Sequence, residues 1–304
     1  MNTEISASDE KFRVAITSVV AAIGLTAMKF VVGLMTGSLG ILSEAAHSGL
    51  DLVAALVTVF AVRASAWPPD ADHPYGHGKV ENLSALFETL LLLLTCLWII
   101  REAVERLFFH PVPVKANLWG FLVIATSIIV DIGRSRALMK VAKKHQSQAL
   151  EADALHFSTD VWSSSVVLLG LGLVFLAERM GLPWLVKADA IAALCVAGIV
   201  VWVSIRLGQK TLRDLMDSVP KDMVERAQKV VLDIPGVMAV PRIRMRKTGG
   251  EWFADVVIEV PGDLSFEEAH AVTEAVEGHL AELLPGGDVV VHAEPARVHP
   301  PTRA

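Results

Sequence analysis

The sequence contains little cysteine: two residues among 304, Cys96 and Cys195, each inside a long apolar stretch. We interpret them as small apolar side chains of membrane helices, which leaves a disulfide or a thiolate metal site as the less favoured alternative. Basic residues are not in excess either, because 33 acidic residues outnumber 27 basic ones and give a net charge of −6. This balance gives no reason to expect nucleic acid as a partner.

Two sequence motifs are also missing. No His-Glu-x-x-His sequence occurs, and no general base is evident beside an open metal position, so we do not expect an enzyme such as an intramembrane metalloprotease. The polar start, MNTEISASDEKFR, lacks the short basic segment and the cleavage site of a signal peptide. The first apolar segment is therefore expected to be retained.

Apolar residues are abundant and come in long runs. They make up 53% of the chain, and the mean hydropathy is +0.51. Because a bilayer-spanning helix needs roughly 20 apolar residues, we expect six such helices in residues 1–208, and residues 209–304 have the composition of a soluble domain. The six predicted spans lie near residues 12–36, 39–63, 80–107, 117–139, 152–178 and 184–208.

Basic residues flank these segments unevenly. They precede the first segment, surround the second–third link, fill the fourth–fifth link and follow the sixth segment: Lys11, Arg13, Arg63, Lys79, Arg134, Arg136, Lys140, Lys143, Lys144, Arg206, Lys210 and Arg213. Arg101, Arg106 and Lys115 around the third–fourth link run against this pattern. The positive-inside tendency predicts a multi-pass protein of the cell (inner) membrane with both termini in the cytoplasm.

Two four-residue steps inside these segments carry the functional signal. His47 and Asp51 lie in the second segment, and His156 and Asp160 lie in the fifth. At a spacing of four, both side chains of each pair share one helix face. The structural alternative is a His–Asp hydrogen bond within each helix. Because ionisable residues at membrane depth are costly, the repeated pair favours a metal path.

The donor types suggest which metal these four residues would bind. Two carboxylates and two neutral imidazoles match a divalent charge, and small residues around both pairs would let the helices approach closely. A mixed nitrogen and oxygen set suits Zn²⁺, whereas Mg²⁺ and Ca²⁺ prefer oxygen alone. The sequence therefore predicts that His47, Asp51, His156 and Asp160 meet as four ligands around one divalent metal ion.

A second candidate set lies in the link after the second segment, WPPDADHPYGHGK. Asp70, His73 and His77 are spaced by three and four residues, and the prolines and glycines mark a loop. A carboxylate and two imidazoles in a short loop can hold zinc. The alternative is a polar turn whose histidines cap helix ends.

The C-terminal region reads as an α/β domain with the order α-β-β-α-β. We expect helices near residues 220–233 and 265–284, the second opened by a capping box of Ser265 and Glu268. Strands are expected at 237–249, 251–260 and 288–295, with Gly249 and Gly250 turning between the first two.

These motifs together resemble the cation diffusion facilitators, a family of six-span metal-cation/proton antiporters. The resemblance is carried by LSEAAHSGLD, DHPYGHGKVENL and HFSTDVWSS, and it covers nearly the whole chain. It implies that the four membrane residues form the transport site and that the His-Asp-His-Asp set goes with zinc-preferring members. It also favours metal binding by the loop set.

For the C-terminal domain the resemblance implies a metallochaperone-like, ferredoxin-like α+β domain that forms a homodimer. Its candidate zinc ligands are Asp255, His270, His292 and Glu294. Pro241 and Val257 stand where relatives with a two-zinc centre have histidines, so a single site is expected. The function implied is Zn²⁺/H⁺ antiport by alternating access. Fe²⁺, Co²⁺, Cd²⁺ or Mn²⁺ as the main cargo is the alternative, and a non-transporting membrane metal sensor is a weaker one.

Overall fold

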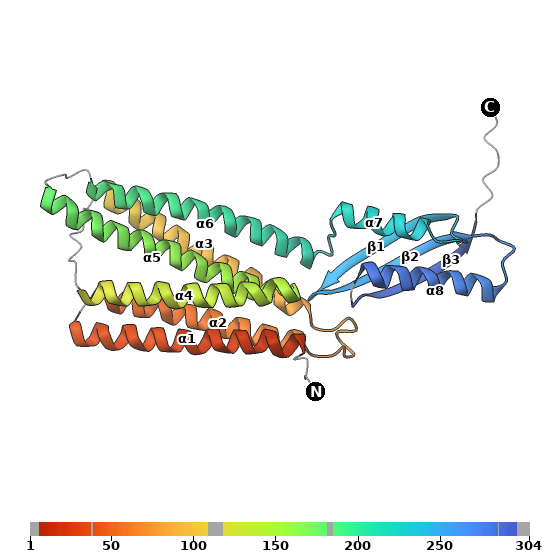
Figure 1. Cartoon of the computed structure of the whole chain (residues 1–304), viewed down its shortest axis with the longest axis horizontal. Coiled ribbons are helices and arrows are strands. Elements are labelled where there is room, and N and C mark those ends of the chain that lie inside the picture. The colour runs from red at the N-terminus through yellow and green to blue at the C-terminus, as the bar shows by residue number, and fades with distance from the viewer. Residues whose placement is uncertain (1–5, 38, 109–117, 181–184, 285, 297–304) are drawn as a thin grey trace, which may run out of the picture. The chain divides into compact units, whose positions relative to one another are not determined.

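A computed structural model describes residues 6–37, 39–108, 118–180, 185–284 and 286–296 (Figure 1). Internal contacts divide the chain into two compact units, Met1–Leu212 and Arg213–Ala304. The first unit is helical and the second combines helices with a sheet. The two expected structural classes, a helical membrane domain and a small α+β domain, are confirmed.

The helical unit contains one long helix for each apolar segment predicted from the sequence. These are α1 (Ala7–Thr36), α2 (Leu39–Ser65), α3 (Lys79–Phe108), α4 (Leu118–His145), α5 (Gln148–Met180) and α6 (Leu185–Leu215). The last helix continues past residue 208, the predicted end of the sixth span. Four helices contain a described stretch that is long and apolar enough to cross a membrane: Ala7–Thr36, Glu44–Ser65, Lys79–Arg101 and Leu194–Leu215.

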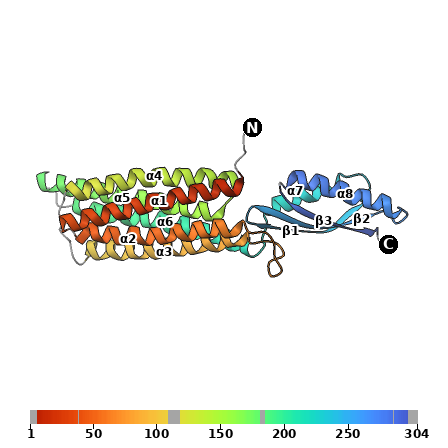
Figure 2. The same cartoon turned by 90° about the horizontal axis from the view of Figure 1, so that it is seen from below.

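The helices run side by side as a bundle, which both views show (Figures 1 and 2). Helix α1 packs against α2 and α4, and α5 packs against α4, α3 and α2. Leu138, Leu150 and Phe157 are fully buried where α4 and α5 meet. Helix α5, which carries one of the two His-Asp steps, is therefore in contact with the helix that carries the other.

Helix α6 meets its neighbours in the bundle near Leu207 and Gly208. Ala85 of α3, Ala152 of α5 and Leu207 of α6 form one buried cluster. A methyl group added at Gly208 would lie 3.3 Å from Thr89 Cγ2, which is tight for carbon atoms. Cys96 is buried, Cys195 is exposed, and both are free thiols.

The second unit consists of α7 (Lys221–Leu232), β1 (Ala239–Thr248), β2 (Glu251–Val260), α8 (Phe266–Leu283) and β3 (Asp288–Pro295), in the predicted order. Strand β2 is central, antiparallel to β1 and parallel to β3. The register shifts between Ala239 and Arg242, where Pro241 has no N–H to donate. Helix α8 begins with the expected capping box of Ser265 and Glu268.

One face of the sheet carries the core of this unit. Ala254, Val256 and Ile258 of β2 pack with Val276 and Leu280 of α8. Alternate residues of a strand point to opposite faces. Asp255 and His292, both exposed, therefore belong to the other face of the sheet.

Candidate metal sites

The two His-Asp steps meet across the contact between α2 and α5. His156 Nε2 lies 3.2 Å from Asp51 Oδ1 and 3.6 Å from Asp160 Oδ2. His47 Nε2 lies 3.9 Å from the same Asp51 oxygen. The ligand atoms of Asp51, His156 and Asp160 all lie within 4.8 Å of one another. The helical spacing aligns each pair, and the packing of the two helices brings the pairs together.

Burial distinguishes the two imidazoles of this group. The side chain of His156 is 3% exposed, whereas that of His47 is 30% exposed. The two carboxylates are intermediate, at 13% for Asp51 and 16% for Asp160. One imidazole is therefore enclosed in the bundle and the other lies at its edge. Asp51, His156 and Asp160 offer one nitrogen and two oxygen donors to a divalent cation, and His47, beside Asp51 but outside this group of three, is the candidate for a fourth.

A further carboxylate, Glu88 of α3, lies on the other side of the His156 ring. Its Oε2 atom is 3.9 Å from His156 Nδ1, and its Oε1 atom accepts a 3.1 Å hydrogen bond from Thr58 Oγ1. Glu88 is 0% exposed. The sequence alone gives no signal for this contact, because no spacing rule relates a residue of the third segment to one of the fifth.

Glu81 at the start of α3 joins four helices at one end of the bundle. Its Oε1 atom accepts hydrogen bonds from the Lys11 ammonium at 2.6 Å and from the Ser65 hydroxyl at 3.1 Å. Its Oε2 atom accepts a hydrogen bond from Ser147. Glu81 is buried. A buried charge of this kind is stable only when it is paired, so this cluster holds α1, α2, α3 and α5 together there.

Two basic residues within the predicted spans, Arg134 and Lys29, have charged and polar partners in the structure. Arg134 lies 3.1 Å from Asp131, donates to Ser18 and covers the ring of Phe157. Lys29 donates to Ser48 Oγ at 2.8 Å and lies 3.3 Å from Glu44.

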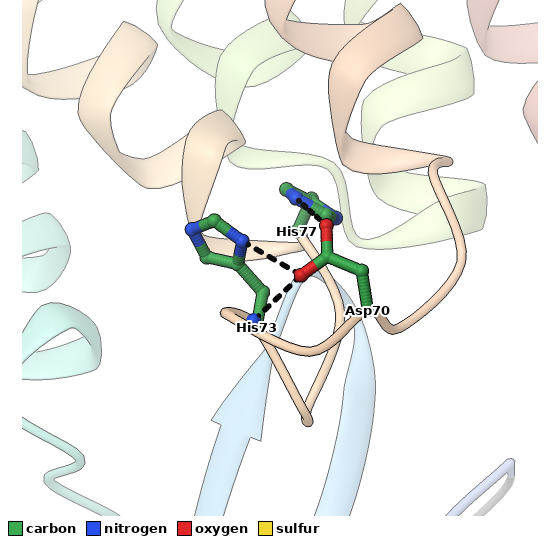
Figure 3. A group of neighbouring side chains, drawn as sticks. All are labelled: Asp70, His73 and His77. Carbon is green, nitrogen blue, oxygen red and sulfur yellow. Dashed lines mark hydrogen bonds and ion pairs between the residues drawn. The ribbon is translucent and has the colours of Figure 1, made fainter.

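The loop set is a compact group in the link between α2 and α3 (Figure 3). Asp70 lies between the two histidines: Oδ1 is 3.1 Å from His73 Nδ1, and Oδ2 is 3.3 Å from His77 Nε2. The centroids of the two imidazole rings are 4.3 Å apart, and the rings of Trp67 and His77 make an edge-to-face contact. Their ligand atoms lie within 4.8 Å of one another, as a shared metal ion would require.

The loop backbone holds the Asp70 carboxylate in place. Its Oδ1 atom accepts hydrogen bonds from the backbone N–H of His73 at 2.7 Å and of Asp72 at 3.0 Å. These bonds, led by that of His73 and assisted by its imidazole, lower the pKa of Asp70 below its usual value. The carboxylate is thus held in its ionised, metal-binding form.

The candidate ligands of the α/β unit are more dispersed. Asp255 of β2 and His292 of β3 are exposed on one sheet face, in neighbouring strands and two positions apart in register. His292 lies 3.9 Å from Glu294. His270 lies on α8, where it stacks on Phe266 and lies 3.7 Å from Glu274. Among the described side chains, none of these four candidate ligands belongs to a group of three or more whose ligand atoms all lie within 4.8 Å of one another. The cytoplasmic site therefore stays a prediction.

Comparisons with known proteins cover both units. The family described as the cation efflux transmembrane domain matches residues 15–216, and the one described as the cation efflux protein cytoplasmic domain matches residues 219–296. A solved fragment named MamM-CTD is 27% identical over 25% of this chain and 98% of the fragment, with a TM-score of 0.24.

Several curated relatives align along almost the whole chain. The cation-efflux pump FieF of Cronobacter sakazakii is 30% identical over 292 residues, which is 95% of this chain and 94% of the relative. The protein of the same name from Salmonella arizonae is 31% identical over 290 residues, again 95% and 94% of the two chains.

Proposed function

The chain belongs to the cation efflux family of membrane transporters, and from this premise we propose that it exports Zn²⁺ in exchange for protons. The observation that carries the proposal is the close approach of Asp51, His156 and Asp160 between α2 and α5, with His47 beside Asp51. Family membership supports efflux of a divalent cation, and the proposal adds the site, the metal and the coupling.

The choice of zinc rests on the donors. Two imidazoles and two carboxylates offer a mixed set of four, which is the number and type that Zn²⁺ takes in proteins. Mn²⁺ prefers carboxylate and water oxygen, so the two imidazoles disfavour it. Co²⁺, Cd²⁺ and Fe²⁺ accept similar donors and are the competing cargoes that a transport assay must rank.

Proton coupling follows from the chemistry of the same four groups. An imidazole must be neutral, and a carboxylate ionised, to bind a metal ion, so protons and Zn²⁺ compete for the site. Loading would occur when the site is open to the cytoplasm. Protonation in the outward-open state would favour release, and return of the protonated site would carry protons inward.

The remaining sites and the assembly belong to the same proposal. We place both termini in the cytoplasm, which puts the loop of Asp70, His73 and His77 on the side where Zn²⁺ is loaded. The C-terminal unit would act as the dimerisation domain of a homodimer and bind zinc through Asp255, His270, His292 and Glu294. Zinc bound there would favour one state of the helices, which is a linkage between two sites.

The decisive experiment uses purified full-length protein in liposomes that contain a pH-sensitive dye. Zn²⁺, Co²⁺, Cd²⁺, Fe²⁺ and Mn²⁺ are offered in turn while cation uptake and internal pH are recorded. The proposal predicts Zn²⁺ movement accompanied by counter-movement of protons, both lost in Asp51→Ala. Zn²⁺ movement without a proton signal would refute antiport, and a stronger response to another ion would replace zinc as the main cargo.

A further inference from the structure

We propose that Glu88 is a positioning residue that sets the proton of His156, so that the nitrogen facing Asp51 and Asp160 is free to bind the cation. This inference rests on the proposed function, because it assigns a role to a residue beside the proposed transport site. The four predicted ligands do not include Glu88.

The His156 ring lies between carboxylates on its two sides. Its Nε2 atom faces Asp51 at 3.2 Å and Asp160 at 3.6 Å, and its Nδ1 atom faces Glu88 at 3.9 Å. His156 Nδ1 and Glu88 Oε2 are both buried, and neither has a hydrogen-bond partner among the described side chains. Buried polar atoms are usually hydrogen-bonded. Two unpartnered atoms that face each other therefore indicate a bond that forms in another state of the site.

The state that would form this bond is the one with a cation bound. A neutral imidazole carries one proton, so the nitrogen that binds a metal ion must be the one without it. With the proton on Nε2, that nitrogen can donate to Asp51, and the site is closed to the cation. With the proton on Nδ1, the lone pair of Nε2 is free to bind the cation. Glu88 then accepts a hydrogen bond from the Nδ1–H group. In metal-binding histidines, the ring nitrogen that does not bind the metal usually donates its N–H to a carboxylate, carbonyl or water.

Glu88 is itself held in place by its neighbours. Thr58 of α2 donates to its other oxygen at 3.1 Å, and both Glu88 and Thr58 are 0% exposed. Thr58 lies on the same helix as His47 and Asp51. The contact series Thr58–Glu88–His156 thus runs from α2 through α3 to α5. A shift of α3 relative to α5 would change the distance between Glu88 and His156, and with it the favoured proton position.

The test compares Glu88→Gln with Glu88→Leu in full-length protein in liposomes, with Zn²⁺ as the probe. Gln keeps an oxygen that can accept from Nδ1, whereas Leu has none. We expect Glu88→Leu to raise the half-saturating Zn²⁺ concentration by about 10- to 100-fold, the usual cost of losing such a partner. Glu88→Gln should remain within a few-fold of the wild type. Equal half-saturation in Glu88→Leu and the wild type would overturn the proposal.

A matched pair of threonine variants keeps the test meaningful if Glu88→Leu fails to fold. Thr58 and Thr89 are both buried, but Thr89 bonds the backbone carbonyl of Ala85 in its own helix, at 2.7 Å. Thr58→Val should weaken Zn²⁺ binding, and Thr89→Val should not. Equal effects of the two substitutions would point to general loss of packing and would overturn the assignment.

A spectroscopic measurement addresses the proton directly. The ¹⁵N spectrum of histidine-labelled, Zn²⁺-loaded protein should show His156 with its proton on Nδ1, assigned by loss of the signal in His156→Ala. That signal should persist in Glu88→Gln, and a proton on Nε2 in the loaded wild type would overturn the proposal. If the wild type neither binds nor moves Zn²⁺, the proposed function itself fails. If it does both and Glu88→Leu matches it, only the role of Glu88 fails.

Discussion

The loop group and the group between α2 and α5 have similar donors but differ in how they are built. Asp70, His73 and His77 lie within eight consecutive residues, and Asp70 is held by the backbone of its own loop. His156 and Asp51 are 105 residues apart and meet only because two helices pack. The loop group is also exposed to solvent at Asp70 and His73, whereas His156 is enclosed.

This difference in construction predicts that the two groups respond differently when the helices move. A locally built group keeps its geometry whatever the helices do, so it is suited to capture an ion. A group divided between two helices changes its geometry when the helices move, and alternating access requires such a change. The predictions below test this division, from the largest expected effect to the smallest.

Removing the shared carboxylate of the helix group should have the largest effect. Asp51 contacts both histidines, so Asp51→Ala removes the oxygen that joins α2 to α5. We expect Zn²⁺ flux in liposomes to fall to the level of protein-free liposomes, while Asp70→Ala in the loop retains measurable flux. If Asp51→Ala transports normally, or if Asp70→Ala is equally inactive, the division of roles is wrong.

Changing one donor type in the helix group should alter the preferred ion. His47 is the more exposed imidazole, so His47→Asp can replace a nitrogen donor by oxygen with little repacking. The preference for Zn²⁺ over Mn²⁺ should fall on the order of tenfold, about 1.4 kcal/mol. Competition between the two ions in liposomes measures this ratio. The control His47→Gln should weaken transport of both ions without reversing their order of preference. An unchanged Zn²⁺/Mn²⁺ ratio in His47→Asp would argue against His47 as a ligand.

Asp70 should not contribute to the release of metal from the loop in mild acid. The folded pKa of Asp70 is lowered, so its ionised form is present above the usual value of about 3.9 and is lost only as pH falls through the lowered value. Between pH 7 and 5 this carboxylate therefore stays charged. Zn²⁺ titrations of the Asp51→Ala protein, in which the helix group is disabled, compare the loop with and without the Asp70 carboxylate. Asp70→Asn should reduce affinity at every pH without changing its slope against pH, and a flatter slope would contradict this.

The α/β unit should show the smallest effects, at most about tenfold in Zn²⁺ affinity. This unit has its own buried core, so residues 213–304 can be studied as a fragment. Asp255 and His292 share one sheet face, and His270 lies on α8. If Asp255, His270 and His292 bind one ion, their substitutions to Ala should be non-additive in calorimetry. Additive losses at Asp255 and His292 would mean that they do not bind one ion.

Local sequence rules were enough to predict several parts of the molecule. A four-residue step fixes His47 beside Asp51 on one helix face, whatever surrounds the helix. The loop group follows from spacing and from residues that break helices, and the capping box of Ser265 and Glu268 is complete within four residues. Each of these local arrangements depends on backbone geometry over one or two turns.

The sequence by itself thus determined which residues could bind metal and which of them share a helix or a loop. Only the tertiary structure decided that Glu88 lies against Nδ1 of His156, that Glu81 joins Lys11, Ser65 and Ser147, and that Asp255 and His270 belong to different layers of the α/β unit. The physical reason is that helix packing sets the rotation and depth of each helix against its neighbours. Such contacts depend on the side chains of several segments at once, and no single segment encodes them.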